Sequence, residues 1–149
     1  MRLWLISILV PALLLAAPVS AQERSAHANY ILRCAGCHGM TGAGAPDAGI
    51  PDFIGLVGAF AGLDEGRTYL MHVPGVVGSG LSDAEIAAVS NYVIETWAGE
   101  SLPADWQPFT EAEVTERRAI DIPDVVAKRR EVVAVLDAMG IETAAYPWP

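Results

Sequence analysis

Two cysteines and a histidine stand together in the first third of the chain, as Cys34, Cys37 and His38 in the sequence C-A-G-C-H. No other cysteine occurs in the 149 residues. Two thiols three positions apart, at the end of a helical turn, can reach two vinyl groups along one edge of a porphyrin, and the adjacent imidazole can then bind its iron. The spacing therefore predicts one covalently attached haem c, with thioether bonds to Cys34 and Cys37 and with His38 as the proximal iron ligand.

Three other uses of a C-x-x-C pair fit the sequence less well. A dithiol redox motif belongs to a strand–helix–strand unit, and no strand pattern precedes Cys34. A zinc site needs about four ligands, whereas the chain has three histidines and no second cysteine pair. A disulfide between Cys34 and Cys37 would close a very short loop and would stabilise little. The N-terminal sequence described below predicts export, and exported proteins can form disulfides, so this last alternative stays open.

Two predicted helices flank the motif. Tyr30 and Ala26 stand four and eight residues before Cys34, and residues four apart share one face of a helix. A second helix begins near Ser82, because the segment Ser82-Asp83-Ala84-Glu85 has the pattern of a capping box. Apolar residues then recur at helical spacing as far as Trp97.

With these features, residues 22–98 resemble the class I c-type cytochromes, a family of monohaem proteins. The haem motif is specific, whereas the helix patterns alone would be weak. The resemblance implies an all-α, cytochrome c-like helical domain around one covalently bound haem. In the family the last helix crosses the first, so we expect Tyr92 to meet Ala26 and Tyr30. The resemblance also implies one-electron transfer, and no nucleophile or carboxylate pair in the sequence indicates an enzyme.

The sequence departs from the family at the second axial ligand of the iron. The family usually places Met-Pro in the loop before the last helix, but here the dipeptide is Val73-Pro74, preceded by Met71 and His72. We predict Met71 as the distal ligand, with His72 as the alternative and an open distal position as a third possibility. A thioether would raise the reduction potential, a second imidazole would lower it, and an open position would admit a small ligand.

Three more side chains with a possible donor atom are assigned other roles. Met40 lies two residues after His38, so the backbone holds it on the proximal side. His27 is interpreted as a surface or packing residue. Asn91 lies in the middle of the second helix and is expected to face solvent.

Other residues are expected to build the haem pocket. The glycine-rich loop 39–51 would pass under the haem edge, and the apolar segment 52–62 would form a wall with partly helical structure. Tyr30 is expected to line the pocket, while Arg67 and Tyr69 are candidates to reach a haem propionate. Arg67 and Tyr69 both lie in a predicted helix, Asp64 to His72.

The first 21 residues have the pattern of a cleavable signal peptide. Arg2 is followed by an apolar run, Leu3 to Ala17, and by small residues at positions 19 and 21. The run is shorter than the roughly 20 residues that span a bilayer, so we predict cleavage after Ala21, export to the periplasm and no stable membrane anchor. The net charge of −9 disfavours nucleic acid and suits a redox protein partner with a basic docking patch.

Residues 99–149 exceed what a minimal haem domain needs. A capping-box pattern opens one helix at Thr110, and a second is predicted from Pro123 to Met139 with a stop at Gly140. The apolar face of this helical extension is expected to pack on the haem domain. Two alternatives to a free electron carrier remain. One is a haem-based small-ligand binder or sensor, and the other is a permanent cytochrome subunit of a periplasmic dehydrogenase complex.

Overall fold

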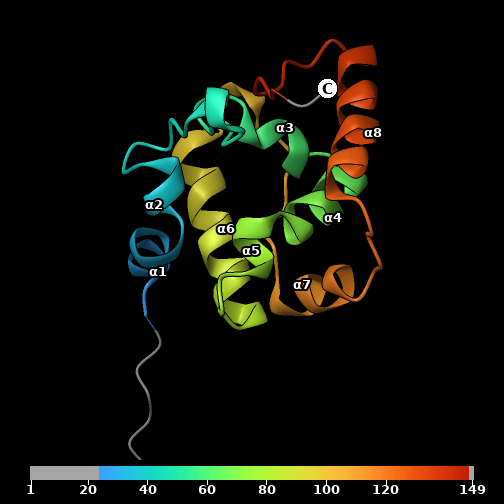
Figure 1. Ribbon diagram of the computed structural model, residues 1–149. Coiled ribbons are helices and arrows are strands. Elements are labelled where there is room, and N and C mark those ends of the chain that lie inside the picture. Colours follow the sequence, from blue (N-terminus) through green and yellow to red (C-terminus); the bar gives the residue numbers. More distant parts are fainter. Residues whose placement is uncertain (1–23, 148–149) are drawn as a thin grey trace, which may run out of the picture.

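The computed structural model describes residues 24–147, so the predicted signal peptide lies outside the described residues. The described part is all-α, as predicted, and its only β-type pairing is a single bridge between Ala45 and Ile50. Figure 1 shows the helices, whose bounds are α1 Ala26–Arg33, α2 Ala35–His38, α3 Val57–Ala61, α4 Asp64–His72, α5 Pro74–Val77, α6 Asp83–Trp97, α7 Glu111–Arg118 and α8 Val125–Ala138. Two short 3₁₀ turns, η1 Pro46–Ala48 and η2 Gly99–Ser101, complete the set.

The first and the longest helix cross, as the family resemblance implied. The Ser25 hydroxyl caps α1 by accepting a hydrogen bond from the Ala28 N–H, and α6 begins with the complete capping box predicted at Ser82. The two helices pack against each other. At the crossing the rings of Tyr30 and Tyr92 lie 5.7 Å apart between centroids, which confirms the expected meeting of these two residues.

The segment before α6 contains three short helices. Helix α4 has the predicted bounds, and its end follows from Pro74, because the residue before a proline avoids the helical region. Val73 is accordingly extended. Helices α3 and α4 approach closely at Gly66, where a Cβ atom would lie 2.2 Å from the carbonyl oxygen of Phe60. No larger residue fits at this position.

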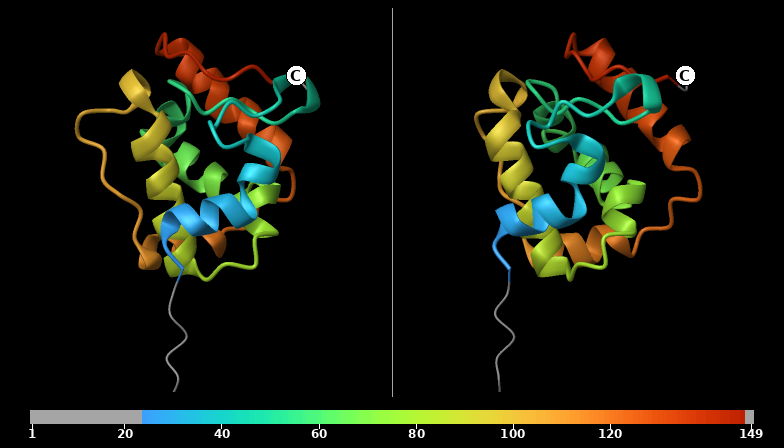
Figure 2. Two further views of the ribbon diagram at one scale, coloured as in Figure 1. Left: turned by 90° about the vertical axis from the view of Figure 1, so that its left-hand side faces the viewer. Right: turned by 60° about the vertical axis from the view of Figure 1, so that its left-hand side comes forward.

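The extension contributes to both apolar cores of the molecule. The main core joins Tyr30, Met71 and Ile86 to Phe109 and Val114 of the extension. A second core joins side chains of α3 and α4 to side chains of α8, and its buried members are Ala59, Phe60, Tyr69, Val132 and Leu136. The two views in Figure 2 show the extension wrapping around the outside of α4 and α6.

Polar contacts fasten the extension to α4 and α6. Arg67 pairs with Glu113, Arg117 with Asp64, and Arg118 with Asp83. The prediction that Asn91 faces solvent was wrong. Its side-chain amide donates to the Phe109 carbonyl at 2.9 Å, and its oxygen accepts from the Phe109 N–H at 2.7 Å.

Two helix starts of the extension differ slightly from the predictions. Thr110 caps α7 through the Glu113 N–H, but the Glu113 carboxylate binds Arg67 and Arg117 instead of closing the box. Helix α8 is capped by Asp124, so Pro123 lies just before the helix. Sequence periodicity locates these helices, whereas long-range ion pairs decide what their end residues do.

Candidate haem site

The predicted haem-binding residues lie at the junction of α1 and α2. Cys34 ends α1, with its N–H donating to the Tyr30 carbonyl, and also begins α2, which runs to His38. Both thiols are free, that of Cys34 half-buried and that of Cys37 exposed. Burial, followed by the neighbouring Cys37, raises the pKa of the Cys34 thiol. Two free thiols on successive turns of helix match the geometry that a doubly attached porphyrin needs.

His38 is held from two sides. Its Nδ1 lies 3.2 Å from the Pro51 carbonyl oxygen, and the Phe53 ring stacks on the imidazole with centroids 4.0 Å apart. Desolvation lowers the pKa of His38, and the bond to Pro51 opposes this effect. A neutral imidazole that donates from Nδ1 to a carbonyl leaves the Nε2 lone pair for a metal. No hydrogen-bond partner of that Nε2 occurs among the described residues.

Tyr30 fixes the shape of the motif. Its hydroxyl donates to the Gly39 carbonyl at 2.6 Å, which ties the middle of α1 to the residue after His38. Burial, then the nearby Cys34 and Tyr92, raises the pKa of Tyr30 to about 12, so the hydroxyl keeps its proton. The ring also lies 4.8 Å from that of Trp97. Tyr30 thus lies beside the motif, and its direct contact with haem stays a prediction.

The glycine-rich loop after the motif packs against α6. A Cβ atom on Gly42 would lie 2.8 Å from the Trp97 ring, and Gly42 has a φ of 80°, which favours glycine. Its carbonyl accepts from the Phe53 N–H at 2.9 Å. The loop therefore places Pro51 and Phe53 against His38. The sequence analysis did not identify Pro51 and Phe53 as contacts of His38, because the glycines of the loop indicated only a close approach of its backbone to the haem.

Met71 and His72, the two predicted distal ligands, lie beside the extension. The Met71 side chain has an exposed fraction of 0% and belongs to the main core. Both residues border a cavity of about 430 Å³ whose other walls are Val77 and, from the extension, Arg118, Ile120, Asp121, Ile122, Pro123 and Val125. Cys34, Cys37 and His38 do not line this cavity.

His72 already uses both of its ring nitrogens. Nδ1 lies 2.8 Å from the Thr68 carbonyl oxygen and Nε2 lies 2.8 Å from the Ile120 carbonyl oxygen. Both ring nitrogens of His72 thus have partners among the described residues. Met71 as the distal ligand and an open distal position both stay predictions.

Arg67 has other partners than a propionate. Its guanidinium donates to both carboxylate oxygens of Glu113 at 2.6 Å, and to the carbonyls of Ala61 and Gln107 at 3.3 and 3.0 Å. It also lies 3.8 Å over the Phe109 ring. Arg67 is thus committed to the joint between α4 and the extension, which corrects its expected place in the haem pocket.

The other predicted residues lie where the sequence indicated. Met40 is 61% exposed, directly after the motif, and His27 is exposed with its ring 5.5 Å from that of Tyr92. Within residues 24–147 no group of three or more His, Cys, Asp or Glu side chains is arranged to hold a metal ion. The structure therefore offers His38 no companions for a zinc site among these residues.

Comparison with known proteins agrees with this geometry. No family model matches the chain. Two curated relatives, each named cytochrome c-552 and both from Thermus thermophilus, are 32% identical to this chain over 125 residues. Each match covers 70% of this chain, and the matches span 95% and 84% of the two relatives. The chain belongs to the c-type cytochrome family.

As a c-type cytochrome, the chain is an electron-transfer protein rather than an enzyme, and its cofactor is haem c. The donor set at α1 and α2 fits that group. Cys34 and Cys37 would hold the porphyrin edge, and His38 would bind the iron through Nε2, oriented by Pro51 and Phe53. The bound haem would supply the redox chemistry, since iron cycles between two oxidation states.

Proposed function

We propose that this cytochrome is exported to the periplasm and carries single electrons through one haem attached to Cys34 and Cys37, with His38 as the proximal ligand. The single observation that carries the proposal is the His38 Nδ1 bond to the Pro51 carbonyl, directly after two free thiols in C-A-G-C-H. That bond orients the imidazole and leaves one nitrogen for iron. A zinc site would need further ligands, and no group of three or more His, Cys, Asp or Glu within residues 24–147 is arranged to hold a metal ion.

The residues around His38 suit a carrier because they pack closely against one another. Phe53 stacks on the imidazole, Tyr30 ties α1 to Gly39, and Trp97 packs against Gly42. Aromatic packing of this kind holds a ligand in one orientation and limits reorganisation when the charge of the iron changes. The chain would thereby position the iron, and the Pro51 carbonyl accepts the Nδ1 proton of His38.

The surface near the motif suits transient docking of a redox protein. Apolar side chains are exposed on both sides of the motif, namely Ile31, Leu32 and Met40. Exposed acidic residues follow at Asp47, Glu95 and Glu100, and the chain carries a net charge of −9. A net negative charge favours a partner with a basic docking patch, because opposite fields speed encounter.

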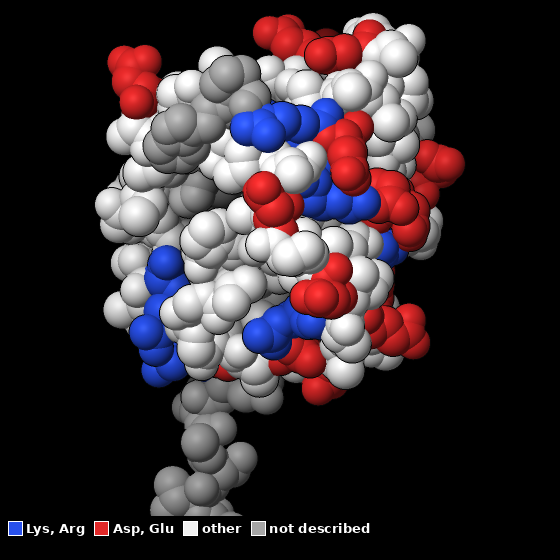
Figure 3. All heavy atoms as spheres, turned by 45° about the vertical axis from the view of Figure 1, so that its right-hand side comes forward, with Lys and Arg blue, Asp and Glu red and all other residues white. Residues whose placement is uncertain are grey.

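The face that carries the extension is different. Acidic and basic side chains are interspersed there (Figure 3), and four basic residues bind acidic ones across the joint, namely Arg67, Arg117, Arg118 and Lys128. Val114 of α7 and Val132 and Leu136 of α8 are buried against α4 and α6, whereas Val135 of α8 is 50% exposed. This supports a free carrier over a permanent subunit docked through the extension. No helix within residues 24–147 is long and apolar enough to cross a membrane.

Spectra of the exported protein and two histidine variants test this function. The native protein should show a reversible one-electron change between oxidised and reduced spectra of c-type haem. His38→Ala should abolish the native spectrum or block maturation, whereas His27→Ala should not, since His27 is an exposed residue of α1. A native spectrum in His38→Ala, or a protein that cannot be reduced and reoxidised, would contradict the proposal.

The second candidate function is the binding of a small ligand, and it depends on the distal side of the haem. Both ring nitrogens of His72 are bound to carbonyls, and Met71 borders a cavity that Cys34, Cys37 and His38 do not line. A haem with an open sixth position binds small neutral ligands such as carbon monoxide. The spectrum of reduced native protein exposed to carbon monoxide distinguishes a small-ligand binder from an electron carrier. A shifted spectrum supports a small-ligand binder, and an unchanged spectrum supports a carrier with both axial positions filled.

A further inference from the structure

A series of aromatic rings connects the proposed iron ligand with the surface of α1. The imidazole of His38 stacks on Phe53 with ring centroids 4.0 Å apart, and the Phe53 ring lies 6.1 Å from that of Trp97. Trp97 meets Tyr92 edge to face at 5.8 Å, and the Tyr92 ring lies 5.5 Å from that of His27. Centroids at such distances belong to rings packed against one another. These residues, called the aromatic series below, therefore form one connected set.

The aromatic series leads from the haem site to solvent. The rings from His38 to Tyr92 belong to half-buried residues, whereas His27 is exposed in the first turn of α1. Tyr92 lies on α6, so the outer end of the series is at the crossing of these two helices. A molecule that docks against the crossing would therefore meet the last rings of the series directly.

Trp97 is fixed at the centre of the series by contacts on three sides. Its ring atoms would lie within 2.8 Å of a Cβ atom on Gly42, and its carbonyl accepts from the Gly55 N–H at 2.7 Å. The Tyr30 ring lies 4.8 Å away on another side. Close packing holds such rings at fixed distances and orientations. Electron tunnelling depends steeply on distance, so a fixed arrangement of rings suits it.

Tyr30 supports the series without holding charge itself. Burial, then the neighbouring Cys34 and Tyr92, raises the pKa of Tyr30 to about 12, and its hydroxyl donates to the Gly39 carbonyl. Oxidation of a phenol releases its proton, and a backbone carbonyl is too weak a base to take it. The series therefore suits tunnelling through filled π orbitals, in which no ring is oxidised and no proton moves.

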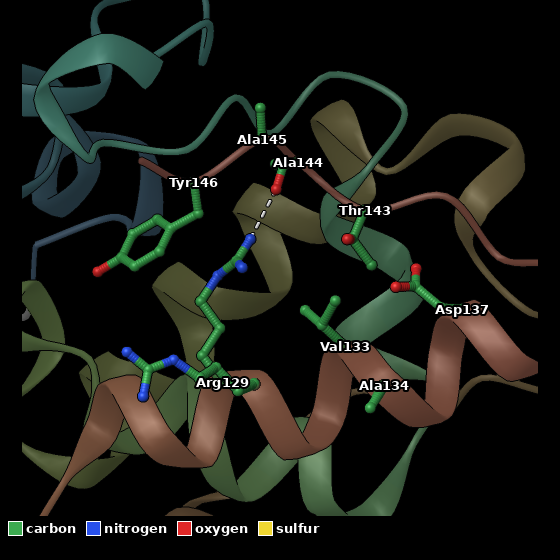
Figure 4. A pocket seen from close by; sticks show the side chains of 9 residues that line it. Arg129, Val133, Ala134, Asp137, Thr143, Ala144, Ala145 and Tyr146 are labelled. Atoms are coloured by element: carbon green, nitrogen blue, oxygen red, sulfur yellow. Dashed lines mark hydrogen bonds between the residues drawn. The ribbon is translucent and has the colours of Figure 1, made fainter. Parts of the chain in front are cut away.

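Other aromatic side chains belong to separate groups. Phe60 and Tyr69 pair at 5.4 Å within the second core. Tyr146 lies beside Arg129, which donates to the Ala144 carbonyl (Figure 4). Within residues 24–147 no ring contact joins Phe60 or Tyr69 to the aromatic series. Among these side chains, the connection from His38 to the surface thus leads to the face of α1 and α6.

We propose that the aromatic series is an electron path between His38 and the crossing of α1 and α6, which would serve as a second place of electron exchange besides the surface at the motif. This inference rests on the haem attachment proposed above. One electron leaves ferrous iron and reduces a one-electron partner docked over Tyr92 and His27. No bond forms or breaks, and no proton is transferred. Packed rings favour this transfer because their π orbitals lower the tunnelling barrier that saturated side chains present.

A photo-oxidant attached to His27 tests the path in the full holoprotein. A ruthenium bis(bipyridine) complex binds accessible imidazoles. Of the three histidines, His38 is the proposed iron ligand and both ring nitrogens of His72 have partners, so the label takes His27. A light flash with a soluble electron acceptor converts the label to ruthenium(III), which then takes one electron from the ferrous protein. The absorbance change of the haem gives the rate constant.

Replacement of a ring by a saturated side chain should slow this transfer. In Tyr92→Leu and in Trp97→Leu the rate constant should fall about tenfold, equivalent to about 1.4 kcal/mol in activation free energy. Tyr92→Phe keeps the ring and should stay within about twofold of the native rate. Trp106→Leu is the matched control, because this indole packs against the same main core and makes no ring contact within residues 24–147. It should also stay within about twofold of the native rate.

Reduction potentials and melting temperatures separate a path from mere packing. A purely structural Trp97 would lower the melting temperature, as Trp106→Leu does, and would leave the rate unchanged at equal driving force. Equal rates in native protein, Trp97→Leu and Tyr92→Leu overturn the proposal. If Trp97→Leu yields no folded holoprotein, the pair Tyr92→Leu and Tyr92→Phe decides, and equal rates in these two variants overturn it.

The electron path and the haem attachment can fail separately. Denaturing gels stained for haem are run for every variant. Covalent haem with a rate that does not depend on the rings overturns only the path. Absence of covalent haem from the native protein overturns the proposed function itself.

Discussion

The two sides of the proposed haem site are built in different ways. The proximal side comes from one stretch of chain, Tyr30 to Phe53, whose parts bind one another through the Tyr30–Gly39 and His38–Pro51 hydrogen bonds. The distal side comes from α4 and α5, which are held by a segment some 50 residues later. His72 binds Ile120, and Arg117 binds Asp64 and Thr68.

This difference explains why one side can be interpreted from a motif and the other cannot. Hydrogen bonds within residues 30–53 orient His38, and Trp97 of α6 supports the loop that carries Pro51 and Phe53. The orientation of Met71 depends on which side of α4 the extension covers. Neighbours on a helix point about 100° apart, so the packing of the extension decides which side chain of α4 faces the haem.

Removal of the extension should destabilise the distal side more than any other change. A chain that ends at Pro103 loses Phe109, Val114, Val132 and Leu136 from the two cores. Burial of such side chains contributes about 1.5–3 kcal/mol each, against a total stability of about 5–15 kcal/mol for a domain. We expect no cooperative melting transition by circular dichroism. A chain that ends at Pro147 is the control, and equal melting of both would show that the distal side does not need the extension.

The ion pair between Arg67 and Glu113 should be the strongest single link of the distal side. The two side chains are only 12% and 22% exposed. Arg67→Ala leaves the Glu113 carboxylate with Arg117 alone and uncovers the Phe109 ring, so we expect a loss of about 2–3 kcal/mol in urea unfolding. Arg33→Ala, at an exposed position of α1, should stay within about 0.5 kcal/mol. Equal losses in the two variants would remove the case for this link.

Acid should weaken the distal side before the proximal side. The side-chain bond from Arg117 lowers the pKa of Asp64, and bonds from Thr115 and Arg118 lower that of Asp83. Carboxyls with lowered pKa values in the folded state stabilise it above their unfolded pKa, and this stability is lost as the pH falls through the folded pKa.

Urea unfolding between pH 6 and pH 2.5 measures this effect. Stability should fall below about pH 4, where an unfolded aspartate titrates. Arg117→Gln should flatten the dependence, because it removes the bond that lowers the pKa of Asp64. A native profile that is flat down to pH 2.5 would contradict these assignments.

The smallest effect is expected at Met71. Met71→Leu keeps the volume of a fully buried side chain, so stability should change by less than about 1.5 kcal/mol. The spectrum of the oxidised protein should not change, since the sulfur is packed in the main core. Loss of a far-red sulfur–iron band in Met71→Leu, with the band kept in His72→Ala, would restore Met71 as the distal ligand.

Much of the fold could be predicted from the sequence because its signals are local. The capping box at Ser82 places α6, Pro74 ends α4, and the spacing of Tyr30 from Cys34 places both on α1. The contacts of Asn91, Arg67 and Arg129 could not be predicted in this way. Each depends on a partner between 15 and 46 residues away, on a segment whose path no local pattern specifies.

The residues of the site likewise divide into those that a local motif identifies and those that depend on remote contacts. Spacing alone identified Cys34, Cys37 and His38, since covalent haem attachment is itself a local requirement. Pro51 was expected only in the loop under the haem edge and Phe53 only in the pocket wall, because a backbone carbonyl leaves no mark in the sequence. Arg67 was a candidate to reach a haem propionate, and it pairs with Glu113 instead.

The mass of the exported protein under denaturing conditions tests the central claim most directly. We predict the mass of the chain from Gln22 to Pro149 plus one haem, and a proteolytic peptide containing Cys34 and Cys37 that carries the whole increment. Cys34→Ser with Cys37→Ser should show the polypeptide mass alone. A native mass without haem, or one reduced by two hydrogens with a disulfide between Cys34 and Cys37, would contradict the assignment.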